Sequence, residues 1–432
     1  MYMVFGFSKY LYQRQFASIT RPGVIPMDLR SSKKTYCKET QRTVAPEETL
    51  KRVEKLLPEA GITRVADITS LDRIGIPVFS SIRPTALNGA ISVYNGKGAT
   101  PIEAKVSAMM EGIERFSAEP LQQNFLNAPF PGLPGGIAGI DPRDLILPEG
   151  ADPGIVIPWV EGYDIAADEQ VLVPANAVFH PLPRFTPALF RTNTNGLASG
   201  NTFEEATFHA LMELIERDAW SLVEVMRNTG SRVTNITGAL PSELLSRFSS
   251  AGVEVTIKDI TSDIGIPTIA AVADDVTLKD PTLLTIGMGT HTNAEIALLR
   301  AITEVAQSRL TQIHGAREDT NVADFRRKMG YERTKRMNRH WFLSEGEKDF
   351  QTVLSCDSDD FRKDIERVVA ALSGAGLDRV IVVDLTRQNI GVPVVRVIVP
   401  GLEVYAMDQE RRGRRCIEAG NRRVPRPKPS FT

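Results

Sequence analysis

The chain has 432 residues, 42% of them hydrophobic and 24% charged, and its formal net charge at pH 7 is −2. This composition is typical of globular proteins, and the balanced charge excludes the strong positive field of most nucleic-acid-binding proteins. The sequence contains no run of about 18 apolar residues, which excludes a membrane-spanning helix. A membrane is therefore not expected among the partners.

The N-terminal 27 residues differ in composition from the rest of the chain. They contain no Asp or Glu and carry Lys9, Arg14 and Arg21 among aromatic residues. A secretory signal is excluded because these residues contain no continuous apolar segment. Two interpretations stay open: a transit peptide, and a true translation start at Met27.

From residue 46 onward, amphipathic helices and strand-like segments alternate, which predicts an α/β fold. Helices are predicted at 46–61, about 101–118, about 202–228 and about 293–314. Strands are predicted at 71–82, 90–96, 171–179, 254–260, 267–274, 282–289, 379–386 and 393–405. The Pro- and Gly-rich stretch 128–157 is expected to be a loop or boundary. The charged stretch 315–350 is expected to be a lid, an insert or a surface helix.

Three of the predicted helices share one pattern of residues. It reads Ala, a polar residue at +3, Ala at +4, Glu at +7, and Glu or Gln at +10. The copies begin at Ala104, Ala206 and Ala297, so they start 102 and 91 residues apart. This spacing predicts one α/β unit that is used three times.

Residues three apart in the sequence project from the same face of a helix. Each of the first two copies therefore presents a pair of carboxylates within an apolar stretch. The four residues are Glu111, Glu114, Glu213 and Glu216, and Ser107 and His209 lie one turn earlier on the same faces. Burying like charges costs free energy unless cations neutralise them. Two facing pairs of this kind would suit Mg²⁺ that shares its ligands with a triphosphate.

Two other interpretations of the carboxylate pairs fit the sequence less well. A single Glu-x-x-Glu-Arg helix is usually a solvated face with local Glu–Arg pairs, but two copies with matching flanks argue against this. A carboxylate-bridged di-iron site would need Glu-x-x-His, whereas His209 precedes Glu213 by four residues.

Several basic and polar residues are candidates for phosphate contacts. Lys97 precedes the first copy, and Asn195 lies in a Gly- and Asn-rich loop before the second, where a helix N-terminus attracts anions. Arg83, Arg300 and Arg309 are further candidates, although structural roles are equally consistent with each of them.

Taken together, these segments resemble the YcaO family over about residues 40–410. The resemblance is carried by residues 71–78, 96–100, 107–115, 193–219 and 289–309. It implies a YcaO fold of pseudo-repeated mixed-sheet subdomains with carboxylate-bearing helices around an ATP cleft, usually in a homodimer. The implied organisation is an N-terminal extension (1–40) that need not be ordered, a YcaO domain (41–410) and a basic Pro-rich tail (411–432). The repeats lie near 90–120, 190–225 and 285–312.

The resemblance also implies roles for single residues. Glu111, Glu114, Glu213 and Glu216 would hold Mg²⁺ ions that bridge the triphosphate of ATP. By the same resemblance, Ser107 and His209 would contact the nucleotide. The four glutamates and the following residues are also predicted to bind it: Arg115, Lys97, Asn195, Arg83, Arg300, Glu304, Gln307 and Arg309. Arg42 and Thr49 keep the spacing of a family pair that touches ATP, although the residue types differ. No catalytic group is identified.

Members of this family attack a peptide amide with a nucleophile and trap the adduct oxygen with the γ-phosphate of ATP, which yields an azoline, an amidine or a thioamide. Residues 31–40 and 89–100 are similar to the methanogen branch. That branch converts a glycine of the methyl-coenzyme M reductase alpha subunit to thioglycine with a sulfide source. The implied partners are that peptide region and TfuA or another sulfide-delivery protein, with no nucleic acid.

The cysteines do not supply a sulfide site of their own. Cys37, Cys356 and Cys416 are widely spaced and form neither a metal pattern nor a disulfide framework. This usage favours a reducing, cytoplasmic compartment. A sulfur-handling role for one of them lacks the support of a neighbouring cysteine.

Two alternatives to thioamidation remain open. Residues 425–429 read P-x-P-x-P, which resembles the azoline-forming branch and favours a cyclodehydratase of a ribosomal peptide. The same motif is consistent with a simple extended terminus. The second alternative is a non-catalytic, nucleotide-binding scaffold, against which the intact carboxylate pairs argue.

Overall fold

The computed structural model describes residues 28–120, 125–134, 137–318 and 322–421. Its α-helices are α1 (Pro46–Val53), α2 (Pro101–Ser117), α3 (Ala175–Val178), α4 (Phe203–Met226), α5 (Ala239–Ser250), α6 (Ala294–His314), α7 (Val322–Met329), α8 (Tyr331–Met337), α9 (Arg339–Phe342), α10 (Phe361–Gly374) and α11 (Arg414–Asn421). The expectations for residues 1–27 and for the motif at 425–429 lie outside the described residues.

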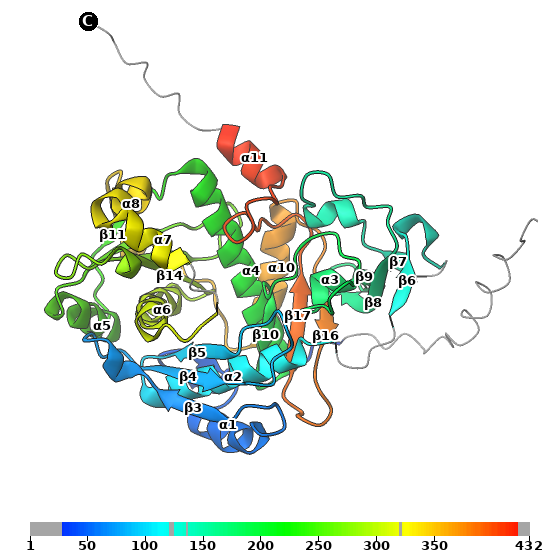
Figure 1. The fold of residues 1–432 in the computed structure, drawn as a ribbon, viewed down its shortest axis with the longest axis horizontal. Helices are drawn as coiled ribbons and strands as arrows, with labels where there is room; N and C mark the ends of the chain where they lie inside the picture. The colour runs from blue at the N-terminus through cyan, green and yellow to red at the C-terminus, as the bar shows by residue number, and fades with distance from the viewer. Residues whose placement is uncertain (1–27, 121–124, 135–136, 319–321, 422–432) are drawn as a thin grey trace, which may run out of the picture.

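The described strands form three larger sheets and one hairpin (Figure 1). The hairpin pairs β1 (Tyr36–Cys37) with β2 (Gln41–Arg42), and the smallest sheet has the order β3 (Arg64–Asp67), β4 (Val78–Ile82), β5 (Val93–Lys97). The five-stranded sheet has the order β14 (Thr285–Thr290), β13 (Thr268–Asp274), β12 (Glu254–Asp259), β11 (Arg232–Thr234), β15 (Glu347–Asp349). The seven-stranded sheet has the order β10 (Leu197–Ser199), β17 (Val394–Ile398), β16 (Ile381–Asp384), β8 (Ile157–Asp164), β9 (Glu169–Pro174), β7 (Ala138–Gly139), with β6 (Leu126–Ala128) paired to β8.

Antiparallel pairing dominates these sheets, but β11 pairs with β15 and β7 pairs with β9 in parallel. Helices lie between and around the sheets, so the predicted mixed α/β class is confirmed. None of the helices within the described ranges is both long enough and apolar enough to cross a membrane.

One structural unit is used three times, as the sequence pattern predicts. In each copy a strand leads into a repeated helix: β5 into α2, β10 into α4, and β14 into α6. The neighbouring strand in the sheet is β4, β17 and β13, respectively. Each neighbouring strand follows a short motif, Ile-Gly-Ile/Val-Pro, at residues 74–77, 390–393 and 264–267.

The three motifs make the same contacts. Their glycines, Gly75, Gly265 and Gly391, all have positive φ, between 66° and 77°, which a glycine adopts without strain. In each copy the carbonyl of the motif's proline accepts a hydrogen bond from a backbone N–H just before the repeated helix. The donors are Gly98 to Pro77 at 3.4 Å, Gly200 to Pro393 at 3.0 Å and His291 to Pro267 at 3.1 Å.

Small residues let each helix approach its strand closely, and this explains the two alanines of the repeat. A Cβ atom at Gly96 of β5 would lie 1.9 Å from the backbone nitrogen of Ala108 and 2.4 Å from the oxygen of Ala104. Gly289 of β14 meets Ala297 and Ala301 of α6 in the same way, at 2.1 Å and 2.7 Å. The close packing therefore fixes the position and rotation of the helices that carry the acidic residues.

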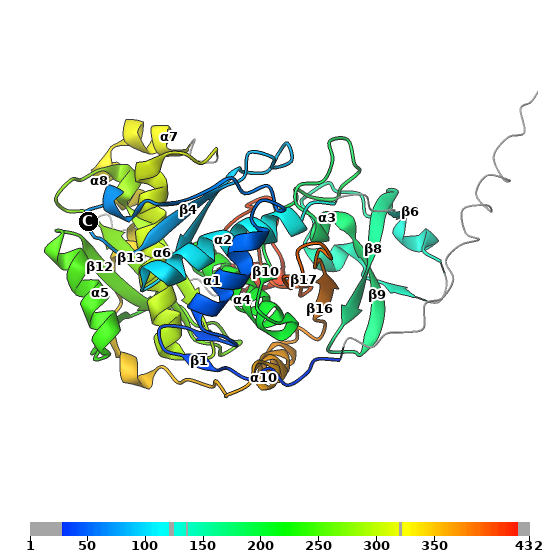
Figure 2. The ribbon, with the colours of Figure 1, turned by 90° about the horizontal axis from the view of Figure 1, so that it is seen from below.

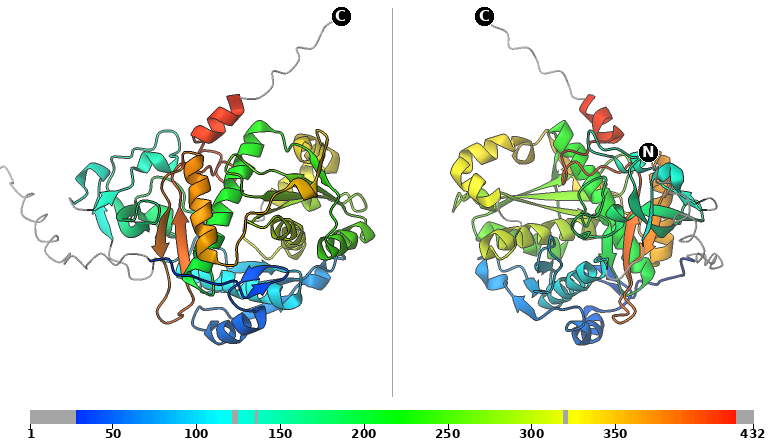
Figure 3. Two further views of the ribbon diagram at one scale, coloured as in Figure 1. Left: turned by 180° about the vertical axis from the view of Figure 1, so that it is seen from behind. Right: turned by 45° about the vertical axis from the view of Figure 1, so that its right-hand side comes forward.

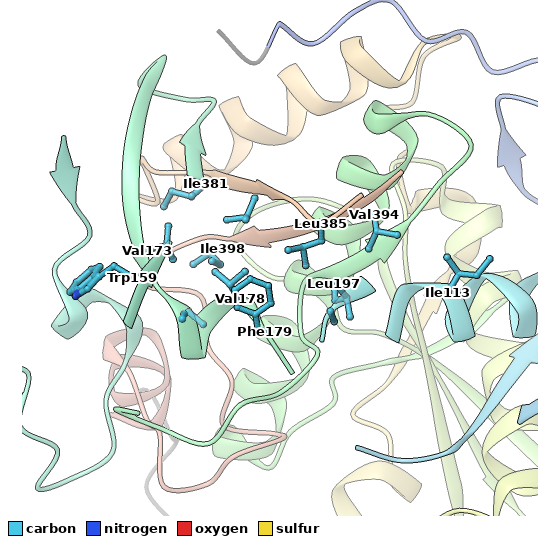
Figure 4. Packing of buried hydrophobic residues seen from close by; sticks show 14 of the residues in the cluster. Ile113, Trp159, Val173, Val178, Phe179, Leu197, Ile381, Leu385, Val394 and Ile398 are labelled. Carbon is cyan, nitrogen blue, oxygen red and sulfur yellow. The ribbon is translucent and has the colours of Figure 1, made fainter. Parts of the chain in front are cut away.

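The largest apolar core fills the space around the seven-stranded sheet and reaches the end of α2. Figure 4 shows Trp159, Phe179 and Ile381 gathered there, with Ile113 of α2 at its edge. Helix α4 runs through the centre of the molecule, where it packs against β10 and β17 and against α10 and α11 (Figure 3). Fifteen of its 24 residues are buried.

The described part of the predicted N-terminal extension packs against the body. Lys34 forms a fully buried ion pair with Asp364 of α10 at 2.5 Å, and the backbone N–H of Ser32 donates to Asp360 at 3.0 Å. In the predicted tail, Arg415 pairs with Asp218 of α4 at 2.9 Å. Residues 28–43 are called the N-terminal strap below.

Several predicted boundaries are wrong for local reasons. The helix predicted at 46–61 ends at Val53 and is followed by a 3₁₀ turn (Glu54–Leu56). Pro58 has no N–H group and therefore cannot donate the α-helical hydrogen bond to Glu54. The strand predicted at 171–179 ends at Pro174, which cannot donate to a strand ladder, and Ala175–Val178 is a helical turn.

Other differences concern the longer segments. Asn95 and Gly96 do not end a strand but lie inside β5, paired with Ser80 and Phe79. The charged stretch 315–350 contains the short helices α7, α8 and α9 rather than one helix. Helices α5 and α10 were not predicted.

We expect Gly96→Ala to lower the free energy of unfolding by about 1–3 kcal/mol, because the added methyl group would collide with the backbone of α2. Chemical denaturation of the purified chain measures this. Gly374→Ala is the matched control, since a Cβ atom there meets nothing within 4 Å. Equal stability of the Gly96 variant and the wild-type chain would contradict the close packing.

Candidate active site

The three repeated helices line one cavity of about 730 Å³. Figure 2 shows these helices, α2, α4 and α6, in the same part of the molecule. Most of the residues predicted to contact a nucleotide line it: Arg42, Thr49, Lys97, Ser107, Glu111, Glu114, Arg115, His209, Glu213, Glu216, Arg300, Glu304 and Gln307. These side chains come from α2, α4, α6, β5 and the segment around α1. The structure therefore brings both predicted carboxylate pairs to one space.

The carboxylates of α2 are held by neighbours on the cavity wall. Glu111 accepts a hydrogen bond from the guanidinium of Arg115 at 3.0 Å. Glu114 accepts one from the backbone N–H of Ser199, in β10, at 3.0 Å. This last contact joins the first repeated helix to the strand that leads into the second.

The carboxyl group of Glu114 is hard to ionise in this position. Burial, with the nearby charges of Glu111 and Glu213, raises the pKa of Glu114 to about 8, against a partial opposing effect of Arg115. The pKa of Glu216 is also raised, by burial and by Glu304. Burial is the larger cause of both shifts, and the charges of neighbouring carboxylates from three helices add to it.

Helix α6 contributes a third wall with a different polar set. Glu304 accepts a hydrogen bond from the ammonium of Lys97, and the side-chain amide of Gln307 donates to the backbone carbonyl of Asn95. Burial disfavours ionisation of Glu304, but Lys97 and Arg217 outweigh it and hold its pKa below the usual range. Glu304 therefore stays charged at neutral pH.

The N-terminal strap closes one end of the cavity. Arg42 donates to Nε2 of His209 and lies 3.7 Å from the carboxylate of Glu205. Burial, with the charges of Arg42 and Arg300, lowers the pKa of His209 well below its ordinary value, so the imidazole is neutral and can accept that bond. Thr49 donates to the side-chain oxygen of Asn201 at 2.9 Å.

Three predicted site residues lie outside this cavity, which corrects their assignment. Arg83 is buried in an ion pair with Glu119, and its Nε donates to Tyr94 at 3.2 Å. Arg309 is buried between two aspartates, with 2.8 Å to Asp72 and 3.1 Å to Asp275.

Asn195 is the third residue outside the cavity. It lies in a separate, smaller cavity, and its backbone N–H donates to Asn193 at 3.0 Å. The Gly- and Asn-rich loop therefore does not turn this side chain toward the large cavity.

Some cavity residues were not predicted, although the repeat contained the signal for them. Arg217 follows Glu216 as Arg115 follows Glu114, and it lies 3.6 Å from Glu216. Glu103 and Glu205 extend the two acidic faces by one further turn toward the helix N-termini, and both line the cavity. Comparing the copies beyond the five shared positions would have found all three.

The donor set fits a polyanion together with a divalent cation. Oε2 of Glu216 is buried without a hydrogen-bond partner, as are the Nε atoms of Arg115, Arg217 and Arg300. Across the described residues, no three His, Cys, Asp or Glu side chains are close enough to hold a metal ion by themselves. Mg²⁺ commonly takes only one or two protein carboxylates and completes its shell with phosphate oxygens and water. The buried Glu216 oxygen and arginine nitrogens without hydrogen-bond partners match that requirement.

Comparisons with known proteins agree with this chemistry. Residues 95–403 match the family model described as YcaO cyclodehydratase, ATP- and Mg²⁺-binding. An uncharacterized protein of Methanothermobacter thermautotrophicus is 54% identical over 383 residues, which cover 87% of this chain and 98% of that protein. An uncharacterized protein in the tfuA 3′ region of Rhizobium leguminosarum bv. trifolii is 34% identical over 395 residues, covering 87% and 92%.

A solved structure is similar over nearly its whole length. The structure of YcaO from Methanopyrus kandleri bound with AMPPCP and Mg²⁺ is 32% identical, with a TM-score of 0.76. The match covers 89% of this chain and 98% of that one.

We expect Glu114→Gln to stabilise the metal-free chain at alkaline pH. The pKa of Glu114 is raised in the folded state, so its contribution to stability is present at low pH and is lost as the pH rises through about 8. Between about pH 5 and 8 the wild-type chain should lose about 1–3 kcal/mol more than the variant, because one pKa unit corresponds to about 1.4 kcal/mol and cavity water screens part of it.

Thermal or urea unfolding in the presence of a chelator measures this difference. Glu243→Gln, on the exposed face of α5, is the control and should keep the wild-type pH dependence. Identical pH profiles for the Glu114 variant and the wild-type chain would contradict the repulsion among the cavity carboxylates.

Proposed function

This chain belongs to the YcaO family of ATP-dependent, amide-activating enzymes, and from that premise we propose that it converts a backbone amide of a peptide to a thioamide. ATP and Mg²⁺ are the cofactors of the family. The observation that carries the proposal is the large cavity, where carboxylates and guanidiniums of three helices face one space and several of their buried atoms lack a hydrogen-bond partner.

The residues of the cavity divide into two groups by charge. We assign Mg²⁺ to Glu111, Glu114, Glu213 and Glu216. We assign phosphate contacts to Arg115, Arg217, Arg300 and Lys97. When bound, ATP supplies the phosphoryl group that carries away the amide oxygen, and Mg²⁺ neutralises its charge. The mixed signs on the wall explain why neither component would bind strongly without the other.

The protein side chains prepare the site for this chemistry. Arg115 and Ser199 hold Glu111 and Glu114 in place before any ligand arrives, which reduces the reorganisation needed on binding. His209 is neutral and already hydrogen-bonded to Arg42, so it orients that guanidinium and does not add a further positive charge. The N-terminal strap covers this end and limits access of water.

The choice of thioamide formation rests on the relatives. The 54% identical protein comes from a methanogen, and the Rhizobium relative lies beside tfuA. We propose a glycine of the methyl-coenzyme M reductase alpha subunit as the substrate, with TfuA or another sulfide-delivery protein as the partner. A homodimer and a cytoplasmic location remain predictions; the three free cysteines agree with a reducing compartment.

Azoline formation is the second candidate, because the matching family model is described as a cyclodehydratase. The two reactions use the same amide activation and differ in the nucleophile, which is external sulfide in one case and a side chain of the peptide in the other. A nucleotide-binding scaffold would use neither.

Mass spectrometry of a reductase-derived peptide, incubated with the chain, ATP, Mg²⁺ and sulfide, separates these functions. A gain of about 16 mass units, from exchange of oxygen for sulfur, supports the thioamide, and a loss of about 18, from removal of water, supports the azoline. Phosphate release should require both peptide and sulfide. Nucleotide binding without turnover of the correct peptide would support the scaffold.

Glu111→Gln and Glu213→Gln should each abolish turnover with little loss of stability, because each removes a charge that Mg²⁺ needs and leaves the shape of the side chain unchanged. Phosphate release and unfolding curves measure the two effects separately. Glu366→Gln, an exposed glutamate of α10, is the matched control and should turn over at the wild-type rate. Unchanged ATP use in both cavity variants would contradict the assignment.

A further inference from the structure

A second, smaller cavity lies beside the large one and contains two buried arginines. Its volume is about 60 Å³, and it is lined by Arg396 of β17, Arg411 of the segment before α11, and the loop residues Asn193 and Asn195. Arg396 and Arg411 are only 4% and 5% exposed. We call this space the arginine cavity.

Both guanidinium groups are bound only to neutral partners. Arg396 donates to the backbone oxygen of Asn193 at 2.9 Å and to its side-chain oxygen at 3.1 Å, and its Nε has no hydrogen-bond partner among the described residues. Arg411 donates to the backbone oxygens of Ile146 and Leu145 at 2.8 Å and 2.6 Å. Its guanidinium also lies 3.8 Å from the ring centroid of Phe190.

The arginine cavity therefore has an excess of positive charge. Neither arginine forms an ion pair with a carboxylate of the described chain, whereas the buried arginines Arg83 and Arg309 both do. Burial lowers the pKa of Arg396 to about 9 and that of Arg411 to about 10, and nearby acidic residues offset this only in part. A buried charge without a partner is costly, and an anion between two guanidiniums would remove that cost.

The size of the arginine cavity limits what could bind there. A volume of about 60 Å³ holds only a few water molecules, since one water needs roughly 10–15 Å³ of such space. A monoatomic or diatomic anion fits such a space, whereas a nucleotide or a peptide segment does not. The size of the cavity therefore favours a small anion.

The wall between the two cavities is thin. Leu214 lines the arginine cavity and its chain neighbour Glu213 lines the large one. Likewise, Asn195 lines the arginine cavity and Leu197 lines the large one, and Gly196 lies between them in the chain. Gly196 has a φ of +79°, and a Cβ atom there would lie 2.4 Å from the oxygen of Val397, so this position favours glycine.

We propose that the arginine cavity is a binding site for a small monoanion, and that hydrosulfide is its ligand during thioamide formation. The choice of hydrosulfide as the ligand rests on the proposed function. The anion site itself rests on the two arginines that have no carboxylate partner. Such a site would hold the nucleophile one wall away from the carboxylates that we assign to Mg²⁺. It would also supply the sulfide-binding feature that the cysteines do not provide.

Bromide is a suitable probe because it is close to hydrosulfide in size and charge and scatters X-rays anomalously. Crystals of the full chain soaked in bromide should give an anomalous peak in contact with both guanidiniums. Arg411→Met should lose this peak, and Arg414→Met, an exposed arginine of α11, should keep it. Ordered water in place of bromide in the wild-type chain would overturn the proposal.

Steady-state kinetics provides the independent test. In Arg411→Met the KM for hydrosulfide should rise at least about tenfold, the loss expected for a charged hydrogen bond, while the KM for ATP stays unchanged. Bromide should compete with hydrosulfide and not with ATP. If the methionine variant does not fold, Arg411→Lys keeps the charge and should show an intermediate KM for hydrosulfide. Equal changes in both KM values would assign Arg411 a purely structural role and refute the site.

The two proposals can fail separately. Bromide binding in a chain that makes no thioamide would refute the reaction and retain the anion site. Thioamide formation with no bromide peak, and with the wild-type KM for hydrosulfide in both Arg411 variants, would retain the reaction and refute the anion site.

Discussion

Repulsion among carboxylates that three helices hold around one cavity is the constraint on which the rest of the structure depends. Each carboxylate on this wall loses hydration and gains like-charged neighbours, which is why the carboxyl group of Glu114 is so hard to ionise. The protein offsets part of the cost with Arg115, Arg217 and Lys97, and with the backbone N–H of Ser199. Binding of a metal ion together with a polyanion would relieve the part of this free-energy cost that the protein does not offset, and this would contribute to the affinity of the site.

Such a site requires a rigid frame, because small movements of the helices would let the acidic side chains turn away from one another. The frame comes from the repeated unit, in which a glycine in the strand, or directly after it in the second copy, allows a helix with two alanines to pack closely on the sheet. The same proline carbonyl anchors the start of the helix in every copy. The three copies differ in the polar residues that face the cavity, so one scaffold supplies acidic walls on α2 and α4 and a mixed wall on α6.

The helices that carry the site could be predicted because their pattern has the period of an α-helix and recurs with the same flanks. Residues 101–118, 202–228 and 293–314 were located to within two residues for that reason. The sequence could not separate Arg83 and Arg309 from Arg300, because an arginine in an internal ion pair looks the same as one in a binding site. Their partners Glu119 and Asp72 are distant in sequence. The Ile-Gly-Ile/Val-Pro motifs were missed because, in the second copy, the strand that carries the motif follows its helix in the chain, which hides the correspondence. Arg396 and Arg411 come together only through the fold, with no pattern that joins them.

The N-terminal strap contacts residues that are synthesised much later than the strap itself. Lys34 is among the first described residues to be made, yet its buried partner Asp364 is 330 residues later, and the strap that this pair fixes also carries Arg42 into the large cavity. A nascent chain cannot satisfy Lys34 until α10 has left the ribosome. The cavity should therefore be completed late in folding, after the sheets have formed, since contacts between distant segments are slow to form. Ligand-binding ability then becomes a property of the finished chain and not of its growing fragments.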